Sequence, residues 1–402
     1  MGDAPFTNPF RPGAGHRPPY LAGRKNEKDE FKKLLGQRVV TDNLVLTGLR
    51  GVGKTVLLEE LKALALADGW LWVGTDLSES ASISEQNIAQ RLITDLSVVT
   101  SAIKIGENIH VPVGFSDEQT TTDVTLTYEL LMATYNNTPG LTVDKLKSVF
   151  AIISPSLSKS GKNGIIFAYD EAQILADHAQ KEQFPLSVLL DLFQSIQRQN
   201  IPFMLVLAGL PTLFPKLVES RTYTERMFRV MFLTQLSEIE SKEAIETPVK
   251  ISKCPVTFNA QAVSLIYQYS GGYPYFIQFI CREAYDSYLQ QVADGIKQSV
   301  PITGIIRKLD TDFFAGRWAR VTDRQQQLLF VIANLESSTS EFTVQEILSK
   351  SDDLLEKSFG RSHINQLLTS LIGSGLVYRD RHGKYLFAVP LMADFIKRTM
   401  ED

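Results

Sequence analysis

Residues 48–55, Gly48-Leu-Arg-Gly-Val-Gly-Lys-Thr55, carry the strongest structural signal in this chain. They fit the pattern G-x-x-x-x-G-K-[ST] and follow a short apolar run at 43–47 (NLVLT). Residues 55–66 then have the apolar spacing of an amphipathic helix. This phosphate-binding pattern requires a strand before it and a helix after it. We therefore predict a phosphate loop, rather than an ordinary glycine-rich turn with a surface lysine.

Each residue type in this loop has a chemical reason to be there. Glycines let the backbone turn tightly enough for successive N–H groups to point at one phosphate, beside the positive end of a helix dipole. Lys54 is expected to contact the β- and γ-phosphates in a catalytic role, and the Thr55 hydroxyl to ligate Mg²⁺. The predicted cofactors are therefore ATP and Mg²⁺. The predicted nucleotide-binding residues of this stretch are Gly48, Arg50, Gly51, Val52, Gly53, Lys54, Thr55 and Val56.

The composition is that of a soluble globular protein. The chain has 402 residues, of which 44% are apolar and 21% charged. Its formal charge of −4 offers no chain-wide attraction for nucleic acid or an anionic membrane, so such contacts need a local patch. The two cysteines and five histidines are scattered, which excludes a disulfide framework and a histidine metal cluster. With no apolar run long enough to span a bilayer and no signal-peptide layout, we expect a cytoplasmic protein without membrane contact.

The rest of the N-terminal half alternates between strand and helix patterns. Strands are expected at 70–75, 164–169, 202–208 and 230–236, and helices at 84–98 and 186–197. Near-continuous apolar strands separated by helices are typical of a parallel sheet covered on both faces. The predicted fold class is therefore α/β, with a P-loop NTPase core.

Composition shifts suggest the domain boundaries. Residues 1–19 form a Pro/Gly-rich arm, and 20–235 form the core with an insertion at about 100–162, where helices are expected around 124–133 and 143–154. Residues 236–318 have helical spacing only. Residues 319–402 contain three helical patterns, a strand, a turn and a second strand, the order of a winged helix-turn-helix.

An acidic pair follows the predicted strand at 164–169. Asp170 is expected to hold Mg²⁺ through water, and Glu171 to act as the general base that polarises the attacking water. The alternative interpretation is a helix start, where acidic residues are favourable for dipole reasons alone. The phosphate loop elsewhere in the chain favours the catalytic role.

With these two motifs, the chain resembles the AAA+ (ASCE-type) ATPases of the origin-recognition and archaeal-ATPase type, related to the STAND NTPases. It also looks like a group of bacterial ATP-binding proteins that end in a winged helix. The segments that carry the resemblance are NPFRPGAGHRPPYLAGR from Asn8, LTGLRGVGKTVLL from Leu46, AYDEAQ from Ala168, LAGLPTL from Leu207, TYTERMF from Thr222 and GGYPYFIQ from Gly271.

The resemblance implies a specific architecture and further site residues. The strand of the acidic pair (Walker B) should be separated from the phosphate-loop (Walker A) strand by one strand, and 236–318 should form a helical lid. Leu21 and Arg24 match the segment that lies against adenine in this family. Pro274 matches the G-x-P motif that closes over the nucleotide; the alternative is a simple helix-breaking turn.

Two departures from the family pattern imply slow turnover. Gly209-Leu-Pro211 stands where a polar sensor residue is expected after a core strand, and Thr212 is the nearest hydroxyl. The usual lid arginine is not evident beside Pro274.

Arg226 matches the family's arginine before the last core strand, which reaches a γ-phosphate in cis or across an oligomer interface. The alternative for Arg226 is a structural salt bridge, and Arg221 is the weaker catalytic candidate.

The C-terminal region could contact DNA. Arg379, Arg381 and Lys384 would lie in the wing, and Asn365 and Gln366 on the outer face of the third helix. However, residues 321–402 contain 9 Lys and Arg against 11 Asp and Glu, which argues for weak DNA affinity or for protein docking.

These observations predict an ATP hydrolase with slow turnover that acts as a nucleotide-dependent switch coupled to a winged-helix module. The alternatives are an ATP-dependent DNA-binding regulator or initiator, and a scaffold of a signalling or defence system with little turnover. The expected partners are ATP and ADP, with DNA, a protein partner or a homo-oligomer as further expectations.

Overall fold

A computed structural model describes residues 7–13, 15–37, 39–101, 104–105, 124–252, 256–297, 299–381 and 383–401. The chain forms two compact units, each with its own hydrophobic core. Unit 1 contains the described residues up to Arg24, Gly48–Val56, and the chain from Leu233 onward. Unit 2 contains Lys25–Thr47 and Leu57–Phe232. The phosphate loop therefore belongs to unit 1, and the acidic pair to unit 2.

Unit 2 is built on a five-stranded sheet with the order β2-β5-β6-β1-β7. The pairs β2–β5, β5–β6 and β6–β1 are parallel, as the apolar strand patterns predict. One strand, β6, separates β5 from β1, which confirms the order implied by the family resemblance. The strand bounds are β1 Asn43–Gly48, β2 Leu71–Val73, β5 Ile165–Tyr169, β6 Phe203–Gly209 and β7 Phe228–Leu233.

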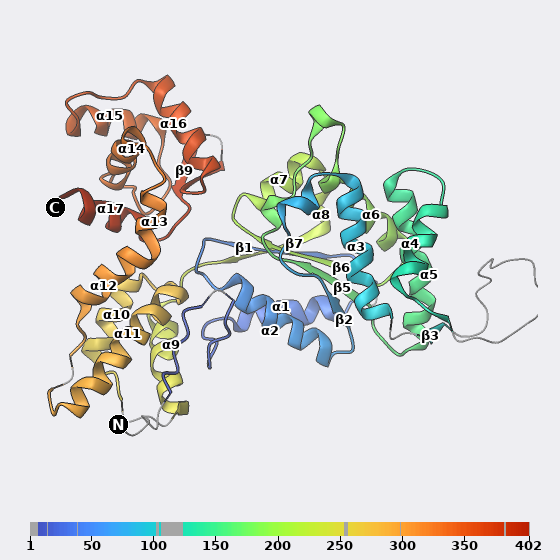
Figure 1. Cartoon of the computed structure of the whole chain (residues 1–402), viewed down its shortest axis with the longest axis horizontal. Coiled ribbons are helices and arrows are strands. Elements are labelled where there is room, and N and C mark those ends of the chain that lie inside the picture. Colours follow the sequence, from blue (N-terminus) through green and yellow to red (C-terminus); the bar gives the residue numbers. More distant parts are fainter. Residues whose placement is uncertain are drawn as a thin grey trace, which may run out of the picture. The chain divides into compact units, whose positions relative to one another are not determined.

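Helices cover both faces of this sheet (Figure 1). Helices α1 (Lys25–Leu35) and α2 (Lys54–Ala67) lie on one face, and α3 (Glu85–Thr100) and α6 (Pro185–Arg198) on the other. Helix α3 begins where the sequence predicts, because the Ser84 side chain accepts a hydrogen bond from the Asn87 N–H. Two short helices follow β6: α7 (Leu213–Ser220) and α8 (Thr224–Met227).

The insertion contains the two predicted helices, α4 (Tyr128–Asn137) and α5 (Thr142–Lys159). Helix α5 joins the core of unit 2, where Phe150 stacks on Phe167 of β5 with ring centroids 5.3 Å apart. Two-residue strands β3 (Lys104–Ile105) and β4 (Val124–Thr125) pair antiparallel. Residues 106–123 lie outside the described residues.

Unit 1 has the predicted helical region and a C-terminal region that share one hydrophobic core. The helices of the first region are α9 (Glu238–Ser252), α10 (Ala260–Ser270), α11 (Pro274–Ala293), α12 (Ile302–Leu309) and α13 (Ala315–Trp318), with a π-helical segment at Asp310–Phe314. The proposed boundary at 318/319 therefore falls inside a continuous core, where Phe314 stacks on Phe395 at 5.0 Å.

The C-terminal region has the predicted order of elements: α14 (Asp323–Ala333), α15 (Val344–Leu354), α16 (Arg361–Gly373), then the antiparallel strands β8 (Val377–Arg381) and β9 (Lys384–Phe387), and a final helix α17 (Met392–Glu401). Its assignment as a winged helix-turn-helix stays a prediction. The turn residue His382 and the Arg381 side chain lie outside the described part.

The N-terminal arm is anchored in unit 1. Phe10 is 2% exposed and packs edge-on against Phe258 and Tyr285. The Asn8 side chain donates to the Arg282 carbonyl at 3.0 Å. The Asn8 side chain also donates to Asp286, and the Arg11 N–H to the Gln278 side chain, so the described part of this segment is held by a buried aromatic ring and by hydrogen bonds to α11.

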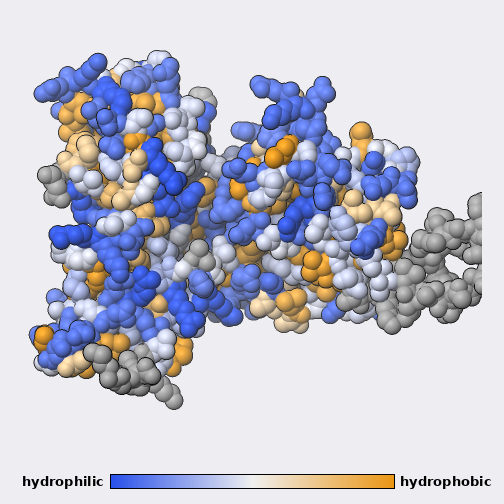
Figure 2. Space-filling model, in the orientation of Figure 1, coloured by the Kyte–Doolittle hydropathy of each residue, from blue (hydrophilic) through white to orange (hydrophobic). Residues whose placement is uncertain are grey.

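Hydrophobic residues on the viewed face form small groups among hydrophilic ones (Figure 2). Among the helices of the described residues, none combines the length and the apolar character needed to cross a membrane.

Candidate functional site

The phosphate loop has the backbone that its sequence predicts. Gly51 and Gly53 have φ values of +79° and +92°, which a residue with a Cβ rarely adopts. Lys54 begins α2 and is 8% exposed. Its Nζ donates to the carbonyls of Gly48 (2.9 Å) and Leu49 (3.0 Å), so the ammonium is held over the loop.

The Arg24 side chain is hydrogen-bonded to the backbone of this loop. It is 5% exposed, and its Nη2 donates to the Val52 carbonyl at 3.0 Å and the Thr234 carbonyl at 2.9 Å. Its side chain therefore ties the loop to the residue that follows β7, while Leu21 is half-buried three residues earlier. We predicted adenine contact for this segment; the loop contact of the Arg24 side chain is an additional role that sequence reasoning missed.

Tyr275 is the second missed residue. Its backbone N–H donates to the Gly51 carbonyl at 3.1 Å, and a Cβ on Gly51 would lie 3.1 Å from the Tyr275 Cβ. Pro274, the predicted site residue, occupies the first turn of α11 directly before it. The GGYP motif therefore brings the start of α11 to the phosphate loop, although only its proline was visible as a signal.

Arg50 extends from the same loop toward the C-terminal region. A Cβ on Gly375, in the turn between α16 and β8, would lie 3.5 Å from Arg50 Nη2. Burial, followed by the charge of Arg50, lowers the pKa of Arg317 on α13. The loop thus contacts α11 through Gly51 and approaches the C-terminal region through Arg50, all within unit 1.

In unit 2, the acidic pair ends β5. Asp170 is 3% exposed, and its Oδ1 accepts the backbone N–H of Glu171 at 2.8 Å. Glu171 has φ +52°, a left-handed conformation that is uncommon outside glycine. The Glu171 carboxylate accepts a short hydrogen bond from the Gln173 side-chain amide. Glu171 precedes only a three-residue 3₁₀ turn, Ala172–Ile174, so it does not start an α-helix.

A buried polar network supports the strand that ends in this pair. The Tyr169 hydroxyl donates to Asp95 of α3 at 2.8 Å, and Asp95 accepts two hydrogen bonds from Arg91. Complete burial and the Asp95 charge raise the pKa of Tyr169 well above its usual value, so it is a neutral donor. This network ties α3 to the residue directly before Asp170.

Asp76 is a third residue that sequence reasoning missed. It follows β2, and its backbone forms a parallel bridge with Asp170. Partial burial, then the charges of Asp170 and Glu171, raise the pKa of Asp76. The available signal was an acidic residue after an apolar strand, which is the same pattern as in the acidic pair.

The residues at these positions fit a bound Mg²⁺. Asp76 follows β2 and the acidic pair follows β5, and burial, then the charges of Asp170 and Glu171, raise the pKa of Asp76, as expected where a cation belongs. Among the described residues, no group of three or more His, Cys, Asp or Glu side chains is placed so that it could hold a metal ion by itself. Mg²⁺ needs no such group, because it keeps several waters and binds one or two carboxylates together with substrate phosphates.

The two candidate arginines near β7 have different surroundings. Arg221 donates two hydrogen bonds to the Asp191 carboxylate, at 3.0 and 2.9 Å, and Tyr223 donates to the same group. Arg221 is therefore held in a structural ion pair. Arg226, on α8, is exposed, and its side chain makes no hydrogen bond or ion pair with the described part of the chain.

The C-terminal region has a polar groove of about 400 Å³ between α15, α16 and the β8–β9 hairpin. Arg361, Asn365, Arg379 and Tyr385 line it. The structure therefore brings the predicted wing residue Arg379 next to the predicted helix residue Asn365. Gln366 is exposed on the same helix, and Lys384 is half-buried at the start of β9.

Comparison by family models finds one match, a domain of unknown function (DUF8462), at residues 311–396. It covers the C-terminal region only, so it does not assign the whole chain to a family. The search of curated proteins gives no match.

Solved structures resemble the chain over nearly its full length. The Walker-type ATPase Paby2304 of Pyrococcus abyssi has a TM-score of 0.58 at 14% identity, covering 94% of this chain and 96% of that one. The ORC2 protein of Aeropyrum pernix has a TM-score of 0.55 at 14% identity in its ADP form and 0.52 at 13% in its ADPNP–ADP complexes, each covering 97% of this chain and 98% of that one. Together with the phosphate loop and the strand order, these likenesses identify the fold as that of the AAA+ P-loop ATPases of the origin-recognition and Walker-type group.

Proposed function

We propose that this chain binds Mg-ATP, hydrolyses it slowly, and acts as a nucleotide-dependent switch coupled to its C-terminal module. Lys54 and the loop amides would hold the phosphates, Thr55 and Asp170 would hold Mg²⁺, and Glu171 would accept a proton from the attacking water. Mg²⁺, when bound, would neutralise phosphate charge. Nucleotide binding is also in keeping with the ADP and ADPNP named for the A. pernix protein of similar fold.

The observation that carries this proposal is the hydrogen bond from the Tyr275 N–H to the Gly51 carbonyl. A phosphate bound by the loop would polarise or move the peptide that includes this carbonyl. The start of α11 is bonded to that carbonyl, so it would respond to the state of the loop. A loop without such a bond could bind nucleotide without any consequence for the lid.

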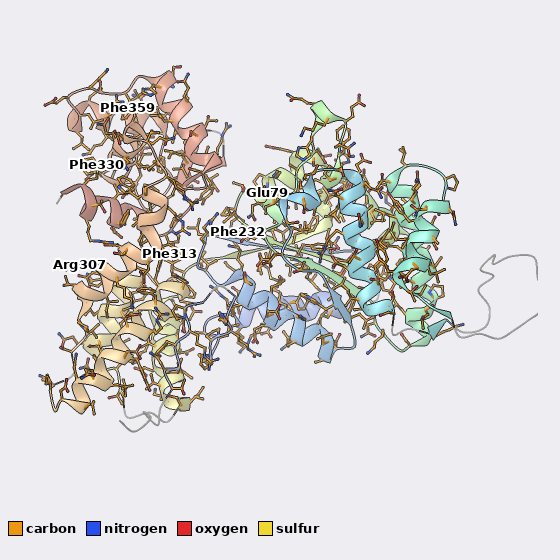
Figure 3. All side chains as sticks on the ribbon, viewed as in Figure 1. Glu79, Phe232, Arg307, Phe313, Phe330 and Phe359 are labelled. Atoms are coloured by element: carbon orange, nitrogen blue, oxygen red, sulfur yellow. The ribbon has the colours of Figure 1, made fainter. Side chains whose placement is uncertain are left out.

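Aromatic packing continues from Tyr275 toward the C-terminus. The ring centroids of Tyr275 and Phe313 lie 5.1 Å apart, and Phe313 is labelled in Figure 3. Phe313 lies 4.9 Å from Phe314, and Phe314 stacks at 5.0 Å on Phe395 of α17. This contiguous packing supports coupling between loop and module, because close-packed side chains transmit displacement rather than absorb it.

Two alternatives predict different behaviour. A DNA-binding regulator in which ATP is structural is favoured by one observation, the groove lined by Arg361, Asn365 and Arg379. A scaffold of a signalling or defence system would bind ATP with little turnover. The switch alone predicts that turnover and the state of the module depend on one another.

Phosphate release from Mg-ATP, with and without duplex DNA and at two salt concentrations, tests the proposal. We expect slow release that requires Mg²⁺ and changes when the module is engaged. Tight ATP binding with no release at either salt concentration would instead support a regulator or scaffold.

Arg226→Ala should lower turnover by about tenfold or more with little change in ATP affinity, because such an arginine acts on charge that develops in the transition state. Steady-state phosphate release and ATP binding are the two measurements. Arg229→Ala is the matched control, since Arg229 is also exposed and lies three residues away on β7.

Mixing the Arg226→Ala and Lys54→Ala variants separates action in cis from action across an oligomer interface. Recovered activity in the mixture means that the arginine of one subunit serves the loop of another. Turnover equal to wild type in Arg226→Ala alone would contradict any role in catalysis.

The C-terminal module should bind DNA weakly, with a log–log salt slope of about −3, as expected for three phosphate contacts from Arg379, Arg381 and Lys384. Replacing all three by Ala should flatten this slope and weaken binding to every sequence alike. Replacing Asn365 and Gln366 should change only sequence preference. Fluorescence anisotropy at several salt concentrations, with ATP and with ADP, measures these effects.

A flat salt response of the wild type, or no binding at low salt with either nucleotide, would argue against DNA. The module would then be a protein-docking domain, and its basic hairpin would be the first surface to test with an acidic partner.

A further inference from the structure

Gln173 lies two residues after the candidate general base and contacts it directly. Its side-chain Oε1 accepts the backbone N–H of Leu210, at the end of β6, at 3.1 Å. Its Nε2 donates to Glu171 Oε2 in a short hydrogen bond. Because the Leu210 N–H can only donate, the amide oxygen must face Leu210 and the NH₂ group must face Glu171. The orientation of this amide is thus determined by its partners.

The rest of Gln173 is held as well. Its backbone carbonyl accepts from Lys216 Nζ of α7 at 2.7 Å. A Cβ on Gly209 would lie 2.6 Å from Gln173 Oε1, closer than real side-chain contacts allow. The absence of a side chain at the end of β6 therefore makes room for the glutamine amide. This accounts for the glycine found where the sequence comparison expected a polar sensor residue.

Glu171 depends on such support. Its left-handed backbone is less favourable for a glutamate than for glycine and persists only where its surroundings hold it. Its N–H is bound to Asp170 Oδ1 and its carboxylate to Gln173, so the two hydrogen bonds restrain backbone and side chain together. Charged groups near this arrangement in unit 2 include Asp76, Asp170 and Lys216, and Lys216 in turn lies near Asp177 and Glu219.

We propose that Gln173 is a positioning residue for ATP hydrolysis. Its side-chain amide links the end of β6 to the carboxylate of Glu171 through two hydrogen bonds. This inference rests on the proposed function. Gln173 itself does not touch the reacting atoms; it holds one oxygen of Glu171 and leaves the other oriented toward the attacking water. A general base is effective only when its oxygen is held within hydrogen-bond reach of the proton that it accepts.

The sharpest test is Gln173→Glu. A glutamate has the same length, and one of its oxygens can still accept the Leu210 N–H, but the change replaces the donor to Glu171 by a second carboxylate, whose charge repels that of Glu171. We expect kcat to fall by about tenfold or more, because the loss of one hydrogen bond to a charged group and the repulsion between the two carboxylates both displace Glu171. KM for ATP and the thermal stability should stay near wild-type values. Gln199→Ala, at an exposed glutamine after α6, is the control.

A double-mutant cycle separates positioning from a general structural effect. In a Glu171→Gln background, Gln173→Ala should cause no further loss of kcat, because the carboxylate on which Gln173 acts is gone. An additive loss, an unchanged kcat in Gln173→Glu, or faster turnover in either variant would overturn the proposal. Wild-type protein that binds ATP without any phosphate release would refute the hydrolytic function itself, and the positioning role with it.

Discussion

Lys54→Ala is expected to abolish nucleotide binding. The ammonium group of Lys54 is held over the phosphate loop by the carbonyls of Gly48 and Leu49, so it is in place before any phosphate arrives. No other lysine lies in the loop to replace its charge. At an ATP concentration of 100 times Kd, wild-type protein should gain about 2.7 kcal/mol of stability, and the variant should gain almost none.

Thermal unfolding with and without Mg-ATP measures this difference. Lys62→Ala is the matched control, because Lys62 lies on the same helix and its ion pair, within the described part of the chain, is an exposed one with Glu59. Equal stabilisation of Lys54→Ala and wild type by ATP would remove Lys54 from the site and, with it, the phosphate-loop assignment.

Glu171→Gln should keep ATP bound and slow its hydrolysis by roughly 10²-fold or more, the contribution typical of a general base. The substitution keeps the size of the side chain and removes its ability to accept a proton. Single-turnover phosphate release and ATP binding, measured on the same preparation, distinguish loss of chemistry from loss of affinity.

The control for this prediction is Glu182→Gln. Glu182 also has φ +52° but lies after an exposed 3₁₀ turn, so it tests the same chemical change at a similarly strained backbone position. Unchanged turnover in Glu171→Gln would mean that Glu171 only shapes the turn after β5, and another group would have to activate the water.

Much of the core architecture could be predicted from local pattern. The loop at 48–55 and the apolar strands specify a P-loop α/β fold, because glycine spacing and strand periodicity act over a few residues. The family resemblance added the strand order, which the sheet confirms. The C-terminal order of three helices and a hairpin also appears as predicted.

Residue roles that depend on partners distant in the sequence could not be predicted from local pattern. The ion pair of Arg221 depends on Asp191, thirty residues earlier in the chain, whereas the sequence had raised a salt bridge as the alternative for Arg226. Adenine contact is predicted for the segment that includes Arg24. The structure shows that the Arg24 side chain donates a hydrogen bond to the carbonyl of Val52, 28 residues away in the phosphate loop. The sequence does not identify Asp191 or Val52 as the partner, because no local pattern marks which of many similar residues will lie beside the arginine in the fold.

The sequence by itself predicted the chemistry that we propose for this protein: a loop for phosphate, a hydroxyl and a carboxylate for Mg²⁺, and a glutamate for water. Only the tertiary structure decided which groups support that chemistry. Tyr275 reaches the loop through its backbone N–H, which carries no side-chain signal. Gln173 reaches Glu171 because β6 ends in a glycine beside it. Residue type specifies what a group can do, whereas its partners are set by packing between segments that are far apart in the chain.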